Sequence, residues 1–298
     1  MTEFIRTPET RFLNLDNFPY TPSYIQNLKD SDGARLSYID EQSDSKETAL
    51  FLHGNPTWSY CYRKMIPIML ESGFRAIAPD MIGFGRSDKP IYQQWHTFEK
   101  HINILRSFIE TLDLTNITLI CHDWGGMFGL NLVPSMPHRF KRIIALNTML
   151  CTGDIMPEIW YRWLAYSNGH PNLDPTECLI DCGCTLTRSE ISSFLAPYPN
   201  ALYKAAFRQF PNFIPDRPER FGAQLGQDSV KFWQQHWQGE SFVAIGMMDE
   251  ILRNPTNDLA CKVIRGCPTP MRIESAGHFL FEWGDQVLQE ALKSFDLK

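Results

Sequence analysis

Short apolar runs alternate with amphipathic stretches along most of the chain. The apolar runs have the length of strands and lie at 49–53, 74–79, 116–122, 142–147, 242–246 and 271–274. Helical patterns lie between or after them, at 60–70, 98–112 and 285–295. Near the start, two short runs flank Asp32-Gly33 and predict a hairpin, with its strands at 24–28 and 36–40. Strands that alternate with helices predict an α/β fold with a mostly parallel central sheet.

The alternation stops between about 150 and 220. This segment is rich in Trp, Tyr, Pro and Cys and has only short helical stretches. We therefore expect a helical cap at 155–218, inserted into an α/β core that is made of 1–154 and 219–298. Insertions of this kind lie over the carboxyl edge of the sheet, where ligands bind.

The composition is that of an ordinary globular protein and excludes several kinds of partner. Hydrophobic residues make up 43% and charged residues 21% of the 298 residues, and the formal net charge is -6. No block of basic residues occurs, so no nucleic-acid partner is expected. The longest apolar runs, such as 49–52 and 242–245, fall far short of the roughly 20 residues of a membrane span, so no membrane partner is expected either.

The cysteines and the amino-terminal segment indicate a cytoplasmic protein. The opening MTEFIRTPETRF lacks the apolar core of a secretory signal. The eight cysteines show no disulfide spacing, so we expect reduced thiols. Cys178, Cys182 and Cys184 cluster, but their spacing is not that of a zinc site and no histidine lies at the usual offset. We expect neither a metal nor an organic cofactor.

The segment CHDWGG at 121–126 lies where a predicted strand turns into a helix. It has the small-x-nucleophile-x-small layout of a nucleophile elbow, in which small residues flank a crowded turn. The central residue is Asp123, where esterases and lipases have serine. An alkylated serine would be an ether that the enzyme could not hydrolyse, whereas an alkylated aspartate is an ester that water can open. The motif predicts attack on an sp³ carbon with a leaving group; the alternative is an aspartate that caps the helix.

Other strand ends carry the residues that such an elbow needs. The segment HGNP at 53–56 follows an earlier strand, and in an α/β-hydrolase fold this loop supplies one oxyanion-hole amide, here that of Asn55, while Trp124 supplies the other. His278 follows the last strand and Asp249 the strand before it. A single His or Asp is more often structural, but the order nucleophile, acid, histidine at three strand ends predicts a catalytic triad of Asp123, Asp249 and His278.

Several segments resemble the haloalkane dehalogenases, and together they span nearly the whole chain. They are IRTPETRFLNLDNFPY at 5–20, HGNPTWSYCYR at 53–63, PDMIGFGRSDKP at 79–90, HDWGG at 122–126, GMMDE at 246–250 and AGH at 276–278. The combination of HGNPTWSY with DWGG is specific to this family, and the similarity weakens in the insertion. The resemblance implies hydrolysis of a small apolar halogenated substrate, with water as the second substrate and halide as a product.

The resemblance also implies the roles of individual residues. Asp123 would be the nucleophile, His278 the base and Asp249 the residue that orients the base. The subgroup with its acid after the later strand binds halide with two tryptophans, of which Trp124 is one by direct match. We take Trp163, from the insertion, as the second. Trp160 and the Asn55 side chain are the alternatives, since another subgroup of the family uses an asparagine.

Two other functions use the same scaffold. An epoxide hydrolase has the same Asp–His chemistry but needs acidic donors for the epoxide oxygen, and the insertion offers four tyrosines, Tyr161, Tyr166, Tyr198 and Tyr203. A hydrolase-fold receptor without catalytic activity would bind a small apolar ligand, and the intact triad argues against it. The sequence gives neither the oligomeric state nor the natural substrate.

Overall fold

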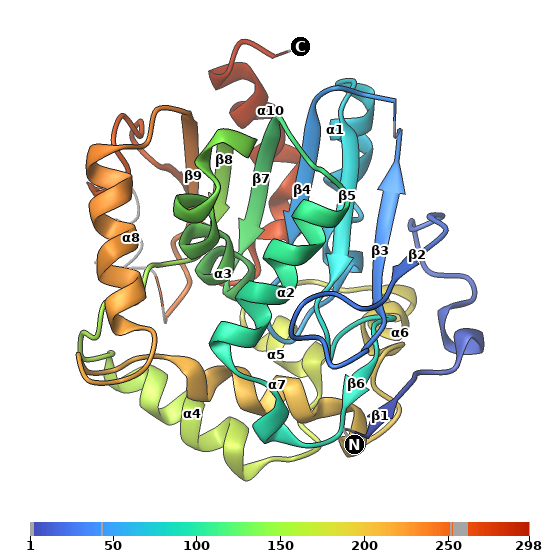
Figure 1. Cartoon of the computed structure of the whole chain (residues 1–298). Helices are drawn as coiled ribbons and strands as arrows, with labels where there is room; N and C mark the ends of the chain where they lie inside the picture. The colour runs from blue at the N-terminus through green and yellow to red at the C-terminus, as the bar shows by residue number, and fades with distance from the viewer. Residues whose placement is uncertain (1–2, 43, 251, 253–261, 298) are drawn as a thin grey trace.

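The computed structural model describes residues 3–42, 44–250, 252 and 262–297. Its centre is an eight-stranded sheet with the order β10-β9-β8-β7-β4-β5-β3-β2 (Figure 1). In that order the strands are Met271–Ile273, Glu240–Gly246, Phe140–Leu146, Ile117–His122, Thr48–Leu52, Arg75–Asp80, Leu36–Glu41 and Ser23–Ile25. The strands from β10 to β5 are parallel, and β3 and β2 run antiparallel to their neighbours. The predicted α/β fold with a mostly parallel sheet is confirmed.

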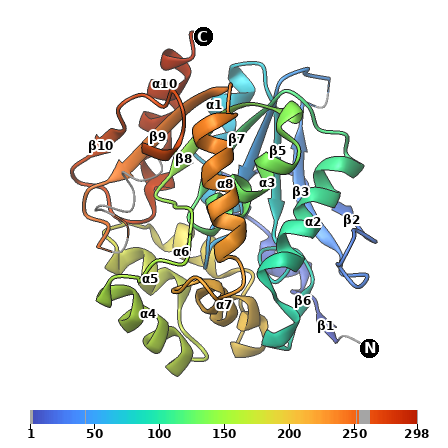
Figure 2. The same ribbon diagram turned by 60° about the vertical axis from the view of Figure 1, so that its left-hand side comes forward.

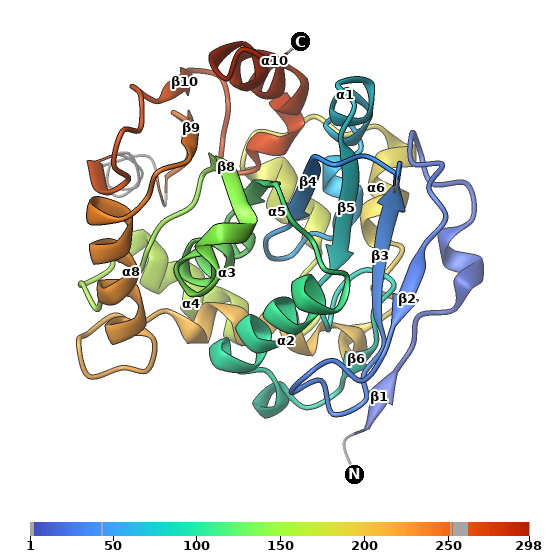
Figure 3. The same cartoon turned by 45° about the horizontal axis from the view of Figure 1, so that its top comes forward.

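The central strands are apolar because helices cover both faces of the sheet. Every residue of β4 and β7 is buried. Figures 2 and 3 show α2, α3 and α8 on one face and α1 and α10 on the other. These helices are Phe98–Thr111, Trp124–Leu132, Ala223–Gln235, Ile66–Glu71 and Gly284–Ser294, respectively.

The sequence of α2 shows why such a helix forms and how it packs. The Thr97 side chain accepts a hydrogen bond from the Lys100 N–H and so satisfies one of the free donors at the start of the helix. Phe98, Ile102 and Leu105 are buried at helical spacing, which gives the helix one apolar face against the sheet.

Helices also form the segment between β8 and α8. They are α4 (Glu158–Gly169), α5 (Pro175–Asp181), α6 (Arg188–Leu195) and α7 (Ala205–Gln209). In Figure 1 they lie together below the sheet, at the carboxyl ends of its parallel strands. The buried Arg63 joins α6 to the rest of the chain, because it pairs with Glu190 at 2.6 Å and with Glu282 at 2.8 Å.

The remaining elements are short. A two-stranded antiparallel sheet pairs β1 (Phe4–Ile5) with β6 (Lys89–Pro90). The 3-10 helices η1 to η8 are Glu9–Phe12, Ser59–Tyr62, Gln93–Trp95, Val133–Ser135, Pro137–Arg139, Ala201–Lys204, Phe210–Phe213 and Leu280–Trp283.

Two sequence-based expectations differ from the structure. The single helix expected at 60–70 is instead a 3-10 turn at Ser59–Tyr62 followed by α1 from Ile66. Pro67 lies in the first turn of α1, and because proline has no N–H it favours a helix start rather than a helix interior. The opening strands do pair in antiparallel fashion, but a segment of irregular structure at 26–35 joins them, with Asp30, Asp32 and Gly33 at positive φ.

Candidate active site

Asp123 lies at the sharp turn between β7 and α3, with φ 50° and ψ -120°. A positive φ is unfavourable for a residue with a side chain, so the surrounding packing has to hold it. Gly125 and Gly126 make this packing possible. A Cβ atom on Gly125 would overlap the Leu52 carbonyl, and one on Gly126 would overlap the Thr148 side chain. The elbow expected at 121–126 is therefore present as a strand–turn–helix.

The loop after β4 reaches the same carboxylate. The backbone N–H of Asn55 donates to Asp123 Oδ1 at 2.8 Å. Gly54 allows this approach, because a Cβ atom there would collide with the Asp123 side chain. The backbone N–H of Trp124 is in the first turn of α3, where N–H groups have no acceptor within the helix. The two amides expected to form an oxyanion hole therefore belong to the loop and the helix start that flank Asp123.

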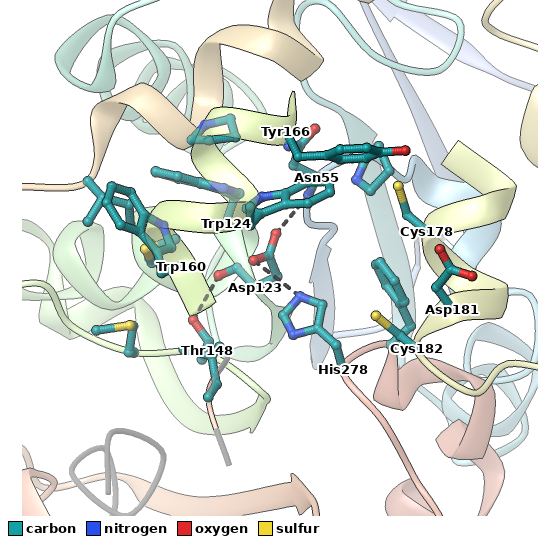
Figure 4. Close-up of a pocket in the computed structure, with 18 of the residues that line it drawn as sticks. Asn55, Asp123, Trp124, Thr148, Trp160, Tyr166, Cys178, Asp181, Cys182 and His278 are labelled. Carbon is teal, nitrogen blue, oxygen red and sulfur yellow. Dashed lines mark hydrogen bonds and ion pairs between the residues drawn. The ribbon is translucent and has the colours of Figure 1, made fainter. Parts of the chain in front are cut away.

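His278 lies between two carboxylates. Its Nδ1 atom is 2.8 Å from Asp249 Oδ2, and its Nε2 atom is 3.5 Å from Asp123 Oδ2. Burial disfavours a charged imidazole, but the carboxylates of Asp249 and Asp123 outweigh this effect and raise the pKa of His278 well above its ordinary value. His278 is thus in contact with both carboxylates of the expected triad. Figure 4 shows the contact between His278 and Asp123.

Asp249 is held by further hydrogen bonds. It is 1% exposed, its Oδ1 accepts from the Leu252 N–H at 3.0 Å, and its Oδ2 accepts from Asn147 Nδ2 at 3.0 Å. A carboxylate with both oxygens occupied in this way has a fixed orientation, so it can also fix the ring of His278.

Sequence reasoning missed the part that Asn147 plays. Its Nδ2 group lies 3.0 Å from Asp249 Oδ2, 3.0 Å from the Gly277 carbonyl and 3.1 Å from the His278 carbonyl. Its Oδ1 accepts from the Gly246 N–H at 2.9 Å. One amide therefore connects the end of β8 to the loops that carry Asp249 and His278. The feature of the sequence that could have indicated this role is the position of Asn147, directly after the strand that neighbours the strand leading to Asp123.

His122 supports the same loop from the other side. Its Nε2–H donates to the His278 carbonyl at 2.8 Å. Burial, followed by the proximity of His278, lowers the pKa of His122 to about 4. His122 is therefore a neutral donor at neutral pH and adds no positive charge beside His278.

Asp123 faces a cavity of about 280 Å³ between the sheet edge and the helices α4 and α5 (Figure 4). Apolar and aromatic side chains make up most of its wall, among them Met127, Trp160, Leu173 and Ile214. Asn55, Asp123, Trp124, Trp163 and His278 also line it. The expected site residues thus meet at one cavity, except Asp249, which lies behind His278.

The indole N–H groups of the two expected halide donors are free as far as the described part of the chain is concerned. Within the described residues, the indole N–H of neither Trp124 nor Trp163 has a hydrogen-bond acceptor. The same holds for Trp160, so the contacts alone do not separate the two cap tryptophans. The Asn55 amide, in contrast, donates to the Phe207 carbonyl at 3.2 Å. One of its two N–H groups is therefore already occupied.

The structure has free cysteines at seven described positions, including Cys178, Cys182 and Cys184. Among the residues with described placement, no group of three or more His, Cys, Asp or Glu could hold a metal ion. Within the same residues, every helix is too short or too polar to cross a bilayer.

Comparisons with known proteins identify the class of this fold and site. Residues 49–285 match the alpha/beta hydrolase fold family. A haloalkane dehalogenase from Psychrobacter cryohalolentis is 42% identical over 73% of each chain. One from Mycolicibacterium paratuberculosis is 31% identical over 98% of this chain and 97% of its own.

A solved structure agrees with these relatives. The tetrameric haloalkane dehalogenase from Paraglaciecola agarilytica superimposes with a TM-score of 0.96 at 43% identity, over 99% of this chain and 100% of that one. The chain therefore belongs to the α/β-hydrolase superfamily and, within it, to the haloalkane dehalogenases. The family predicted from the sequence motifs is confirmed.

Proposed function

We propose that this chain, an enzyme of the class that hydrolyses carbon–halogen bonds, converts haloalkanes to alcohol and halide through an ester on Asp123. The observation that carries the proposal is the position of the nucleophile. A carboxylate at an elbow faces an apolar cavity, and a histidine held by a second carboxylate lies 3.5 Å away.

In the first step, a carboxylate oxygen of Asp123 attacks the carbon that carries the halogen, on the side opposite to the leaving group. A C–O bond forms, the carbon–halogen bond breaks, and the halogen leaves with the bonding electrons as halide. Negative charge develops on the halogen in the transition state. The N–H groups of Trp124 and Trp163 would stabilise it, and because an indole N–H only donates, it cannot compete as a nucleophile.

In the second step, His278 takes a proton from water, and the oxygen of that water attacks the ester carbonyl carbon of Asp123. The backbone N–H groups of Asn55 and Trp124 would donate to the resulting oxyanion. Asp249 stabilises the imidazolium that forms. Collapse breaks the bond between the carbonyl carbon and the alkoxy oxygen, and the alkoxide takes one proton of the water from His278 and leaves as the alcohol. The other proton of the water is released to solvent, which restores the Asp123 carboxylate.

Trp163 is our proposal for the second halide donor. It shares the cavity with Trp124, and its N–H has no acceptor among the described residues. The hydrogen bond from the Asn55 amide to Phe207 argues against the Asn55 side chain in this role. Trp160 lies three residues earlier on the same helix and lines the same cavity, so it is the alternative to test.

The cap tyrosines argue against an epoxide hydrolase. That activity needs hydroxyl donors inside the cavity, and Tyr166 is the one cap tyrosine among the described residues that line it. The Tyr198 hydroxyl donates to the Pro56 carbonyl at 3.1 Å, and the Tyr161 hydroxyl lies 3.3 Å from Asp216. The triad geometry likewise argues against a receptor without catalytic activity.

Three further aspects stay proposals. We propose that 155–218 is a cap over a core of 1–154 and 219–298, which the helical character of 158–213 supports. The free thiols support the cytoplasm as the location. The relative from P. agarilytica is tetrameric, which makes a tetramer the assembly to test by light scattering.

The proposed function is tested by halide release from 1-bromobutane, with 1,2-epoxyhexane as the competing substrate. We expect bromide and 1-butanol in equal amounts and no diol from the epoxide. Diol formation without bromide release would identify an epoxide hydrolase. Binding of 1-bromobutane without any product would identify a receptor.

A further inference from the structure

Three of the described side chains that line the catalytic cavity are exposed to solvent. Among the described residues that line it, Tyr166, Glu177 and Asp181 are exposed, and all others are buried or partly buried. Figure 4 shows Tyr166 on α4 and Asp181 on α5, with Trp124 and Asp123 between the two helices. These three exposed residues, one aromatic ring and two carboxylates, form what we call the cavity entrance.

Helix α5 presents its carboxylates and thiols on one face. Glu177, Cys178, Asp181 and Cys182 follow the spacing of neighbouring helical turns, and all four line the cavity. Cys178 is buried and Cys182 is partly buried, whereas both carboxylates are exposed. The thiols therefore face the inner part of the cavity, and the carboxylates lie at its outer edge.

Within the described part of the chain, neither carboxylate at the entrance forms an ion pair. Within the described residues, neither Glu177 nor Asp181 has an ion-pair or hydrogen-bond partner, and no lysine or arginine lines the cavity. Lys204 lies near enough to Glu177 for the negative charge of Glu177 to act on the Lys204 ammonium. The Lys204 ammonium, however, is buried and donates to Asn172 and Leu173 carbonyls at 3.2 and 2.8 Å.

A second observation, independent of the carboxylates, indicates that the cavity behind the entrance binds a ligand. Trp124 is 4% exposed, lines the cavity, and has an N–H without an acceptor among the described residues. A buried donor of this kind is expected to meet an acceptor from a ligand. Charge at the entrance therefore acts on a molecule whose halogen end lies deep in the cavity.

We propose that Glu177 and Asp181 select haloalkanes that carry a positive charge distal to the halogen, such as ω-halogenated alkylammonium compounds, and disfavour anionic ones. This inference rests on the proposed function. The apolar wall accommodates the methylene chain, the two carboxylates attract the cationic end, and the Tyr166 ring offers a face for a cation–π contact. Anionic haloalkanes meet two like charges at the same place.

Three bromides that differ mainly in terminal charge test this inference. They are (5-bromopentyl)trimethylammonium, its neutral carbon isostere 1-bromo-6,6-dimethylheptane, and 6-bromohexanoate. We expect the kcat/KM for the cation to be about tenfold above that for the neutral isostere, and the kcat/KM for the anion to be the lowest. The tenfold factor corresponds to the attraction of one positive charge by two carboxylates at roughly 6 Å in water. The difference should shrink when sodium sulfate raises the ionic strength.

A double variant, E177Q/D181N, should bring the cation-to-isostere ratio close to one. The matched control is E71Q/E110Q, which also removes two exposed carboxylates. These lie near the carboxyl ends of α1 and α2, just before β5 and β7 begin, at the edge of the sheet opposite the cavity. The control should keep the wild-type ratio.

The outcomes separate this inference from the proposed function. A wild-type ratio near one, or a ratio that E177Q/D181N leaves unchanged, would overturn the entrance selectivity. A ratio that falls equally in both double variants would overturn it as well, because net charge rather than the entrance would then be responsible. If the wild type does not turn over even 1-bromobutane, the proposed function itself fails.

Discussion

The Nε2 atom of His278 lies 3.5 Å from the Oδ2 atom of Asp123. This distance is longer than that of a strong N–H···O hydrogen bond, so His278 does not hold the Asp123 carboxylate in such a bond. The ring nitrogen nevertheless points at the group that would carry the alkyl ester. A water molecule close to both residues could give its proton to His278 and attack the ester of Asp123. This geometry is compatible with both proposed steps, since His278 is near the proposed ester and leaves the Asp123 carboxylate available for displacement.

Replacement of Asp123 by Asn should abolish halide release and leave the fold intact. The amide is neutral and a poor nucleophile, whereas its size matches that of the carboxylate. Ion chromatography of bromide from freshly purified D123N protein checks this. Near-normal initial turnover would exclude Asp123 as the nucleophile. Slow recovery during storage would instead report deamidation to Asp, which mass spectrometry detects as a gain of about 1 Da.

Replacement of Asp249 by Ala should reduce turnover strongly. His278 would lose the acceptor at its Nδ1 atom, 2.8 Å away, and with it the stabilisation of its charge. By analogy with serine hydrolases, the loss in kcat is on the order of 10⁴-fold. Steady-state kinetics, together with circular dichroism as a control for folding, measure the effect. A loss below tenfold in a folded variant would mean that another group orients His278.

Replacement of Trp163 by Phe should weaken halide binding with little change in stability, since an N–H is lost and an aromatic ring is kept. A lost transition-state donor costs roughly 2.7–4 kcal/mol, so kcat/KM should fall by about two to three orders of magnitude. Bromide quenching of tryptophan fluorescence measures the ground-state affinity. W160F is the matched control on the same helix. A larger effect in W160F than in W163F would transfer the role to Trp160.

The two chemical steps should respond differently to acid. Asp249 and Asp123 both raise the pKa of His278 in the free enzyme. Alkylation turns Asp123 into a neutral ester, so the pKa of His278 is lower in the intermediate than in the free enzyme. Because the base has to be neutral, ester hydrolysis is fast above that lower pKa and falls about tenfold per pH unit below it.

Single turnovers quenched over a range of pH values test this difference. We expect the halide burst to persist at acidic pH, where hydrolysis of the ester has slowed. The pKa of the hydrolysis profile should lie below the His278 pKa that NMR gives for the free enzyme. A burst that disappears together with hydrolysis would show that displacement also needs the neutral base.

The fold and the meeting of the three candidate triad residues were predictable because each rests on a local pattern. Buried parallel strands appear in the sequence as continuous apolar runs. The elbow needs small residues at fixed positions around Asp123. The order of Asp123, Asp249 and His278 along the chain follows the order of the strands, so their meeting at one sheet edge required no knowledge of side-chain contacts. The haloalkane dehalogenase family followed from motifs that lie on this scaffold.

The rest of the site depends on contacts that no local pattern encodes. Trp160 and Trp163 are three residues apart on α4, which places both on neighbouring positions of one helix face, so the sequence could not separate them. The hydrogen bonds of Asn147 reach the Gly277 and His278 carbonyls, 130 and 131 residues further along the chain. The role of the entrance carboxylates could not be predicted from the sequence either. Exposed acidic residues on a helix are common, and only the structure shows that these two line a cavity.

The most direct test of the two-step mechanism is the H278F variant incubated with 1-bromobutane. Displacement needs the Asp123 carboxylate and the halide donors, whereas hydrolysis needs the base that this variant lacks. We predict release of about one bromide per active site and an intact mass increased by one butyl group, which peptide mapping places on the segment 121–126. An unmodified mass in a folded variant, with an active wild type, would contradict an alkyl-enzyme ester as the intermediate.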